Sequence, residues 1–243
     1  INEVPSEVLI CDKFLKNAYE YSENIVKRDL HSPAILFWGI GNDFDVTTKN
    51  SKNYALKMKE VINAVDKRPI YYTSRNLEND VVNSVISIKG YNISDINYSD
   101  AKLKIEKIDN SKFNFISAIG VSVDNENRNG FGDVRSAEYQ AKYITEAINT
   151  SSSLSGFVLN SYADYNTESP LLINFNKSNP NLRTDGLFDY NRNAKYSVNI
   201  LKRMLNNQGY QKIPEGNVIF NYSVTSNYFV IFGLAIFILI LLT

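Results

Sequence analysis

The sequence of 243 residues is poor in the residue types on which several classes of function depend. Its one cysteine, Cys11, excludes a disulfide framework and a thiolate zinc site within the chain. Its one histidine, together with scattered acidic residues, does not make a metal-ligand set. Lys and Arg number 26, as do Asp and Glu, so the basic excess typical of nucleic-acid binders is missing. We therefore expect no metal, no other cofactor and no nucleic-acid partner.

Charge is also missing from the last part of the chain. Residues 228–243 are uncharged and apolar, and the last charged residue before them is Glu215. A helix of about 16 residues spans about 24 Å. An uncharged flank supplies the remaining length needed to cross the roughly 30 Å hydrocarbon core. We predict a truncated transmembrane helix at 227–243 after a linker at 213–226, the alternative being a buried element of the globular part. The protein would then be a single-pass membrane protein with its globular part outside the cytoplasm.

The remaining sequence alternates between helical and strand patterns, which indicates βα units and a parallel sheet. No Gly-x-Gly-x-x-Gly follows a predicted strand, and no phosphate-binding loop occurs, so a dinucleotide-binding fold is disfavoured. Half or more of a (β/α)₈ barrel fits better. The predicted helices are 11–30, 50–65, 98–108, 136–148 and 194–205, and the predicted strands are 34–42, 70–74, 81–88, 113–123 and 156–163.

The stretch from His31 to Asp43 carries the most information. It reads His-Ser-Pro-Ala-Ile-Leu-Phe-Trp-Gly-Ile-Gly-Asn-Asp, a buried strand that ends in the amide of Asn42 and the carboxylate of Asp43. Barrel enzymes hold their catalytic groups at the carboxyl ends of parallel strands. The stretch resembles the acid/base strand of glycoside hydrolase family 2, the β-galactosidase and β-glucuronidase group, which ends in Gly-Asn-Glu. Here the final residue is one methylene shorter.

Four further segments resemble the same family in the same order. Together they correspond to strands four to eight of its barrel, and the resemblance covers about residues 1–206. We therefore expect an α/β fold, a partial (β/α)₈ TIM barrel over 1–212, without the first three strands. Because the chain starts without Met and stops inside an apolar run, we expect a fragment of a longer protein. The four segments are Val65-Asp-Lys-Arg-Pro69, Val85-Ile-Ser-Ile-Lys-Gly-Tyr91, Gly156-Phe-Val-Leu-Asn-Ser-Tyr-Ala-Asp-Tyr165 and Thr184-Asp-Gly-Leu-Phe-Asp-Tyr-Asn-Arg-Asn-Ala-Lys195.

The resemblance also assigns the two catalytic positions. The family's retaining mechanism uses two carboxylates about 5–5.5 Å apart, one as acid/base and one as nucleophile. Asp43 matches the acid/base, and serves either as a shortened acid/base or as a polar group that binds a hydroxyl or caps the next helix. The nucleophile position falls on Ala118, whose methyl group cannot attack a sugar. Asp124 and Glu126 follow in a polar loop as candidate substitutes.

A substrate pocket is implied at the same ends of the strands. Trp38 fits the barrel core as well as a substrate platform. The residues that would form the polar mouth and the aromatic walls are Asn42, Tyr91, Asn160, Asp164 and Trp38.

Three functions stay open on the sequence. The first is a membrane-attached, glycosidase-like barrel that binds carbohydrate but has lost hydrolysis, which Ala118 together with Asp43 favours. The second is an active retaining O-glycosidase with rearranged carboxylates. The third is a non-catalytic, membrane-tethered scaffold. The sugar, the linkage and the oligomeric state are not fixed by the sequence.

Overall fold

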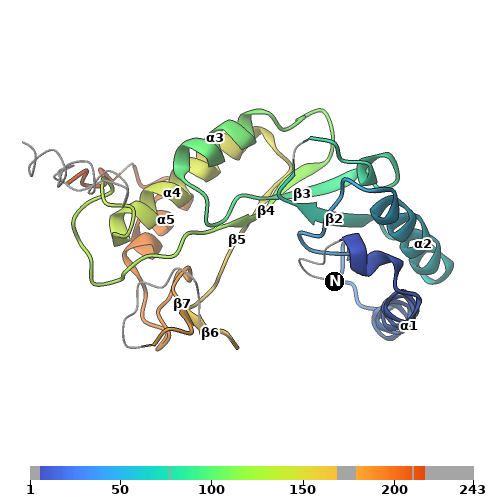
Figure 1. Cartoon of the computed structure of the whole chain (residues 1–243). Helices are drawn as coiled ribbons and strands as arrows, with labels where there is room; N and C mark the ends of the chain where they lie inside the picture. The colour runs from blue at the N-terminus through green and yellow to red at the C-terminus, as the bar shows by residue number, and fades with distance from the viewer. Residues whose placement is uncertain (1–5, 77, 169–178, 210, 217–243) are drawn as a thin grey trace, which may run out of the picture. The chain divides into compact units, whose positions relative to one another are not determined.

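The computed structural model describes residues 6–76, 78–168, 179–209 and 211–216, and these fall into two compact units (Figure 1). The first unit takes in 1–121 and 143–162, and the second takes in 122–142 and 163–243. One helix, α4, begins in the second unit and continues into the first.

The first unit is built on a parallel sheet of five strands that follow one another in sequence order. Parallel neighbours need a crossover connection between them, and repeated crossovers of this kind build an α/β barrel. The parallel sheet predicted from the sequence is therefore present. Its strands are β1 (Trp38–Gly39), β2 (Ile70–Ser74), β3 (Ile88–Asn92), β4 (Asn114–Ile119) and β5 (Phe157–Leu159).

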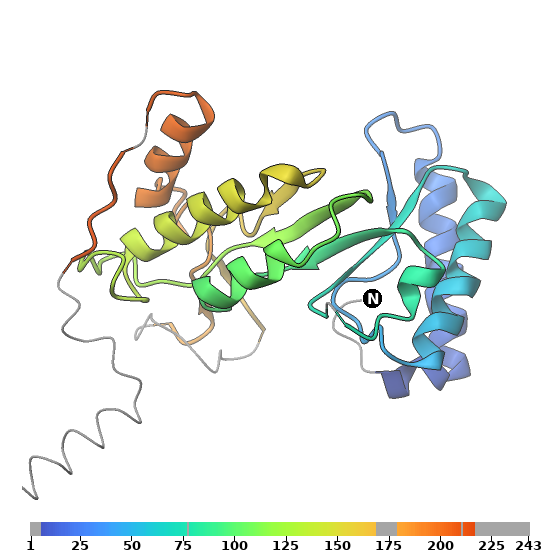
Figure 2. The ribbon, with the colours of Figure 1, turned by 90° about the horizontal axis from the view of Figure 1, so that it is seen from above.

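Helices stand between these strands, close to where the sequence predicts them. Figures 1 and 2 show α1 and α2 lying side by side next to the sheet of the first unit. The second unit also holds a small antiparallel pair, β6 (Tyr165–Asn166) and β7 (Leu182–Arg183). The helices of the described residues are η1 (Ser6–Ile10), α1 (Asp12–Asp29), α2 (Lys49–Val65), η2 (Val82–Ser84), α3 (Tyr98–Glu106), α4 (Ala137–Thr150), η3 (Ser151–Ser153) and α5 (Tyr196–Leu205), where η denotes a 3₁₀ helix.

The third strand lies farther along the chain than the sequence predicts. The apolar run 81–88 passes through η2, and β3 begins only at the end of this run. A side-chain cap accounts for the difference, because Oδ1 of Asp80 accepts a hydrogen bond from the amide of Val82 at 3.0 Å and fixes a turn there. Val82 and Ile86 are buried, so the run is apolar without being a strand.

One face of the sheet is closed by α2. Tyr54, Met58 and Ile62 recur every four residues along α2, and all three are buried. The ring of Phe44 lies 5.7 Å from that of Tyr54 and 6.4 Å from that of Tyr72 on β2, measured between centroids. These contacts join helix and sheet into the main apolar core of the first unit.

The opposite face of the sheet carries aromatic side chains that reach solvent. Successive strand residues point to opposite faces, so Tyr71 lies on the face away from α2. Its ring lies 5.6 Å from that of Phe115, and the rings of Phe37 and Phe113 lie 5.4 Å apart. A Cβ at Gly39 would meet the Tyr71 ring at 2.9 Å, so this glycine leaves room for the ring. In a closed barrel, such a face points inward.

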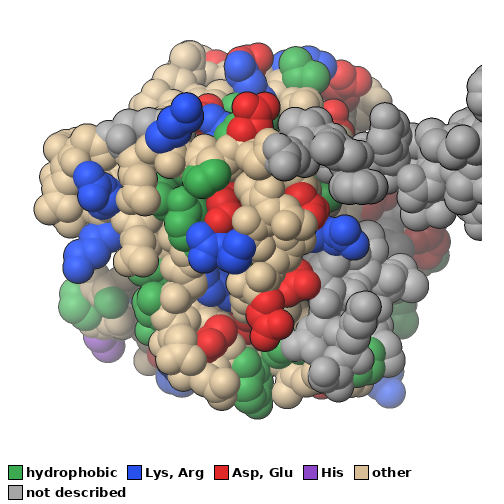
Figure 3. Space-filling model, turned by 90° about the vertical axis from the view of Figure 1, so that its left-hand side faces the viewer, with side chains coloured by type: hydrophobic (Ala, Val, Ile, Leu, Met, Phe, Trp, Pro, Cys, Tyr) green, Lys and Arg blue, Asp and Glu red, His purple; other side chains and the backbone are tan. Residues whose placement is uncertain are grey.

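Charges of both signs are intermixed on the face of the molecule shown in Figure 3, in keeping with the zero net charge of the chain. On the face shown in Figure 3, Lys and Arg side chains stand among Asp and Glu side chains. In the second unit, Arg128 pairs with Glu138 at 2.6 Å and Arg135 with Asp133 at 3.6 Å.

The fold expected from the sequence, a partial barrel followed by a transmembrane helix, needs a correction in its second part. Among the helices of the described residues, none has the length and the apolar character needed to cross a bilayer. The predicted span at 227–243 itself lies outside the described residues. The position of the barrel outside the cytoplasm stays a prediction.

Candidate functional site

Polar residues gather where the strands of the first unit end. Asn42 and Asp43 follow β1, and Thr73 lies near the end of β2. The hydroxyl of Thr73 donates to Oδ1 of Asn42 at 2.5 Å, and the amide of Asp43 donates to the carbonyl and the hydroxyl oxygen of Thr73 at 3.1 Å each. The side chain of Thr73 therefore holds the Asn-Asp tip in place. Helix α2 is capped by Thr48, not by Asp43.

The Asp43 carboxylate is buried but only half engaged. Its side chain is 3% exposed, and the backbone takes a left-handed conformation with φ of 53°. Oδ2 accepts a hydrogen bond from Nδ2 of Asn92 and lies 3.4 Å from Nε of Arg75. Oδ1 is also buried, and within the described residues it has no hydrogen-bond partner. An unpaired buried acceptor costs about 1–3 kcal/mol, so a donor from a ligand would be stabilised there.

Asp43 is held in a closed ring of hydrogen bonds and one ion pair. Oδ1 of Asn92 accepts from the amide and the hydroxyl of Ser94, at 2.8 and 2.7 Å. Arg75 donates to the Ser94 carbonyl at 2.8 Å through Nη1, and its Nε returns to Asp43. A carboxylate fixed from two sides in this way cannot move toward a ligand without breaking the ring.

Ala118, the predicted nucleophile position, lies beside the same ring. Ala118 on β4 is the register partner of Asn92 on β3, and the amide of Ile93 donates to the Ala118 carbonyl at 3.1 Å. Asn92 therefore stands between Asp43 and Ala118. Next to Ala118, the hydroxyl oxygen of Ser117 is buried and has no hydrogen-bond partner within the described residues.

Asp124 and Glu126, the candidate substitutes for the nucleophile, belong to the second unit. There the Asp124 carboxylate accepts a hydrogen bond from the amide of Glu126 at 3.1 Å, which forms a local turn. Among the described residues, no three His, Cys, Asp or Glu side chains gather in a way that would hold a metal ion.

Trp38 lies at the start of β1, away from the strand end that carries Asp43. It is buried, its indole N–H donates to Oδ2 of Asp66 at 3.0 Å, and the Arg68 guanidinium lies 5.2 Å from its ring centroid. Hydrogen bonds from the backbone of Arg68 first, and then from Trp38 and the Arg68 side chain, hold the pKa of Asp66 below its usual value. These contacts make Trp38 part of the core.

Tyr91 is half-buried and shares a face of β3 with Lys89. The ammonium of Lys89 lies 4.7 Å from the Tyr91 ring centroid and 2.5 Å from Oδ2 of Asp80. Burial, and then the Asp80 and Asp109 carboxylates, raise the pKa of Tyr91 to about 12. Burial lowers the pKa of Lys89, against the opposite effect of Asp80. The Tyr91 hydroxyl is therefore a neutral donor at physiological pH.

Asn160 follows β5 in the first unit. Its amide donates to the Ile119 carbonyl at 2.8 Å, and its side-chain oxygen accepts from the Ser161 hydroxyl at 3.1 Å. The backbone oxygen of Asn160 lies 1.7 Å from where a Cβ at Gly120 would stand, so this close approach requires glycine.

Asp164 belongs to the second unit, and the chain itself engages both of its carboxylate oxygens. Oδ1 accepts from Nζ of Lys195 at 2.6 Å and from the amide of Gly186 at 3.0 Å, while Oδ2 accepts from Nδ2 of Asn125 at 3.2 Å. The side chain is 1% exposed. Asp164 therefore ties together three segments of the second unit.

Sequence reasoning missed four residues of the ring and its support, namely Thr73, Arg75, Asn92 and Ser94. Thr73 and Arg75 had a signal, because a Thr-Ser-Arg triplet stands at the end of a predicted strand. Ser94 had none, because its contact with Arg75 joins residues 19 positions apart.

Comparisons with known proteins agree with this architecture. A family model of the glycosyl hydrolases family 2 TIM barrel domain matches residues 7–208. The GH2 β-galacturonidase from Eisenbergiella tayi bound to galacturonate is 20% identical, with a TM-score of 0.72 over 87% of this chain and 40% of that one. The β-D-glucuronidase of Dictyoglomus thermophilum is 18% identical, with a TM-score of 0.69 over 80% of this chain and 36% of that one.

A third solved structure, Bifidobacterium dentium β-glucuronidase complexed with coumarin-3-O-glucuronide, is 16% identical, with a TM-score of 0.71 over 84% of this chain and 35% of that one. This chain thus spans two fifths or less of the length of these proteins. No curated protein matches it. The chain belongs to glycosyl hydrolases family 2, whose TIM barrel domain it shares.

Proposed function

We propose that this barrel domain binds carbohydrate at the rim around Asp43 and does not hydrolyse it by the family's retaining mechanism. The observation that carries the proposal is the methyl group of Ala118 beside Asn92, where the mechanism requires a carboxylate. A methyl group has no electron pair with which to attack the anomeric carbon. Without a carboxylate at this position, the covalent intermediate on which retention depends cannot form.

The geometry of Asp43 supports the same conclusion. Asp is shorter than Glu by one C–C bond, about 1.5 Å, and a displacement of about 1 Å at a catalytic group can lower the rate 10²-fold. The hydrogen bond from Asn92 and the ion pair with Arg75 hold the carboxylate in place, so it cannot swing outward to recover that reach. Asp43 is better suited to accept a hydrogen bond than to protonate a leaving group.

Three groups at the rim support carbohydrate binding. Oδ1 of Asp43 and the hydroxyl of Ser117 are buried without partners in the described structure, and Asn42, next to Asp43 in sequence, is exposed. Sugar hydroxyls both donate and accept, so they complement a carboxylate oxygen, a hydroxyl and an amide. Aromatic rings on the same sheet, such as Tyr71, add a stacking surface.

The relatives indicate which sugars to test first. The Eisenbergiella tayi protein was solved with galacturonate, and the Bifidobacterium dentium protein with a coumarin glucuronide. Both ligands contain a hexuronate, and the rim of this chain holds a partly exposed cation, Arg75. We take a hexuronate as the preferred ligand class.

Binding is tested by isothermal titration calorimetry of galacturonate and glucuronate into the full 243-residue chain. Asp43→Asn should weaken binding about tenfold, because the donors Asn92 and Arg75 keep the amide oxygen facing them and turn an N–H₂ toward the ligand. The matched control is Glu106→Gln, an exposed carboxylate on α3, which should leave the affinity unchanged. Absence of binding to any sugar would refute this half of the proposal and favour a scaffold.

Hydrolysis is tested separately with nitrophenyl β-galactoside, β-glucuronide and β-galacturonide. The wild-type chain should release no more nitrophenol than buffer does. Turnover by the wild-type chain that disappears in Asp43→Asn would show a working acid/base and overturn the inactive assignment.

A further inference from the structure

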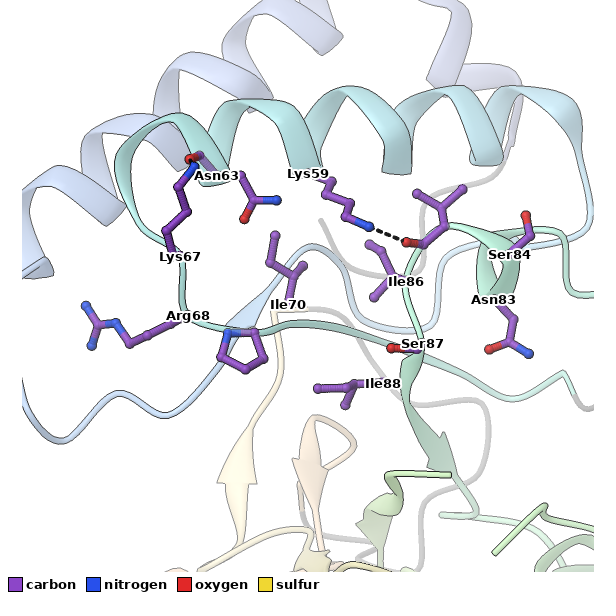
Figure 4. Close-up of a pocket in the computed structure, with 12 residues that line it drawn as sticks. Lys59, Asn63, Lys67, Arg68, Ile70, Asn83, Ser84, Ile86, Ser87 and Ile88 are labelled. Atoms are coloured by element: carbon purple, nitrogen blue, oxygen red, sulfur yellow. Dashed lines mark hydrogen bonds between the residues drawn. The ribbon is translucent and has the colours of Figure 1, made fainter. Parts of the chain in front are cut away.

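A pocket lies at the opposite end of the same strands. It lies between the last turns of α2 and the starts of β2 and β3, and its volume is about 300 Å³ (Figure 4). We propose that this pocket binds a small organic anion, a carboxylate attached to an apolar ring or chain. Its head group would lie at Lys59 and Lys67, and its apolar body over Ile70, Ile86 and Ile88.

The charges of the pocket favour an anion. Its lining includes three basic side chains and no acidic one. Nζ of Lys59 donates to the Val85 carbonyl at 2.8 Å, and Nζ of Lys67 donates to the Asn63 carbonyl. Because an ammonium carries three N–H groups, each lysine keeps two for a ligand. The C-terminus of α2 contributes about half a negative charge, which two full positive charges outweigh.

The third basic residue, Arg68, lines the pocket but does not serve the ligand. Its Nε donates to Oδ2 of Asp66 at 2.6 Å. Nη1 donates to the carbonyls of Ser32 and Ile35 at 2.8 and 3.0 Å, and Nη2 donates to that of Leu30 at 2.7 Å. Figure 4 shows its guanidinium pointing away from Lys59. The site therefore depends on the two lysines.

The floor of the pocket requires an apolar ligand body. Ile70 and Ile86 are buried, and Figure 4 shows Ile70, Ile86 and Ile88 below the lysines, with the Asn63 amide near them. An apolar surface with a few convergent polar groups, in a volume of about 300 Å³, is typical of a small-molecule site. Inorganic phosphate would pair with the lysines but would leave the isoleucine side chains exposed to solvent.

This pocket is separate from the proposed sugar site. Ile70 lines the pocket, whereas Thr73, three residues farther along β2, supports Asp43. Three residues of strand span about 10 Å. Occupation of the pocket therefore requires neither Asp43 nor a sugar, and its failure would leave the proposed function untouched.

The test is calorimetric titration of benzoate into the full 243-residue chain. Lys59→Gln and Lys67→Gln should each weaken benzoate binding about fivefold, as expected for loss of one partly solvated charge contact. The matched control is Lys57→Gln, since Lys57 lies on α2, pairs with Glu60 at 3.0 Å and does not line the pocket. Lys59→Arg should keep the affinity. Benzamide, neutral and of similar shape, and inorganic phosphate should both bind more weakly than benzoate.

Three results would overturn the proposal. One is the absence of saturable benzoate binding to the wild-type chain. Another is equal weakening by Lys57→Gln and by the two pocket substitutions, which would indicate general charge attraction. The third is benzamide binding as tightly as benzoate. The melting temperatures of all variants should match that of the wild type, since both pocket lysines are exposed. If Lys59→Gln lowers the melting temperature, Lys59→Arg, which keeps the charge, serves as the comparison for binding.

Discussion

Two buried carboxylates, one in each unit, differ in how fully the chain satisfies them. Asp164 in the second unit is 1% exposed, and both of its oxygens accept hydrogen bonds from Lys195, Gly186 and Asn125. Asp43 in the first unit is 3% exposed, and only Oδ2 is engaged. A family resemblance alone placed both in one substrate pocket. Their hydrogen bonds indicate a structural role for Asp164 and a ligand-binding role for Asp43.

The cations beside them differ in the same way. Lys195 is 4% exposed, so its pair with Asp164 is closed to water, whereas Arg75 beside Asp43 is 38% exposed. Burial lowers the pKa of Lys195, and its hydrogen bond to Asp164 opposes that shift. A fully satisfied carboxylate holds a fold together, and a half-satisfied one at a strand end leaves an acceptor for a ligand.

The largest expected effect comes from breaking the satisfied pair. Asp164→Asn leaves the Lys195 ammonium buried without the carboxylate that it pairs with, and loss of one partner of a buried pair costs about 3–5 kcal/mol. We expect urea unfolding to show a loss of that size. The control is Glu20→Gln, which removes an exposed pair with Lys16 at 3.8 Å and should change stability by less than about 0.5 kcal/mol. Equal losses of stability in Asp164→Asn and Glu20→Gln would show that Asp164 stabilises the fold no more than an exposed carboxylate does.

A glycine substitution tests the same cluster through its backbone. A Cβ at Gly186 would stand 2.3 Å from the backbone of Ala163 and Asp164, so Gly186→Ala must displace the carboxylate's own segment. Overpacking of this kind costs about 1–3 kcal/mol. Gly156→Ala is the matched control, since nothing lies within 4 Å of its added Cβ, and it should be neutral or slightly stabilising in the same urea experiment.

The sequence predicts well what depends on neighbours in the chain. The order of the parallel strands and the polar tip at Asn42 and Asp43 follow from periodicity and from a motif that is continuous in sequence. The false strand at 81–88 shows the limit of such patterns, because the buried turn capped by Asp80 has the same apolar composition as a strand.

What the sequence does not predict are contacts between distant residues. The indole of Trp38 reaches Asp66, 28 positions away, and Lys195 reaches Asp164 across 31 positions. Asn92 reaches Asp43 across 49 positions. Such pairings decide whether a polar side chain is available to a ligand, and only the folded arrangement of strands and loops brings the partners together.

The effect of Asp43→Asn on stability should be smaller than that of Asp164→Asn. Asn tolerates the left-handed backbone at this position, where φ is 53°. It also keeps an oxygen toward Asn92, and it removes the charge from an acceptor that has no partner within the described residues. We expect a change in unfolding free energy within about 1 kcal/mol, measured by urea unfolding. A loss as large as that of Asp164→Asn would mean that Asp43 is structural.

The smallest effect concerns Tyr91 on β3 and appears only at high pH. The pKa of Tyr91 is raised from 10.0 to about 12, chiefly by burial, so between these values the folded state holds a proton that the unfolded state has lost. The stability contributed is complete below pH 10 and lost as the pH rises through about 12. Tyr91 is partly exposed, so solvent screening reduces this contribution to about 1 kcal/mol.

Tyr91→Phe should therefore lower the alkaline sensitivity of unfolding. In a tyrosinate absorbance titration, the difference between wild type and variant should show one ionisation near 12. An ionisation near 10 instead would mean that Tyr91 is open to solvent and available to the rim, which would narrow the contrast between a closed structural cluster and an open binding site.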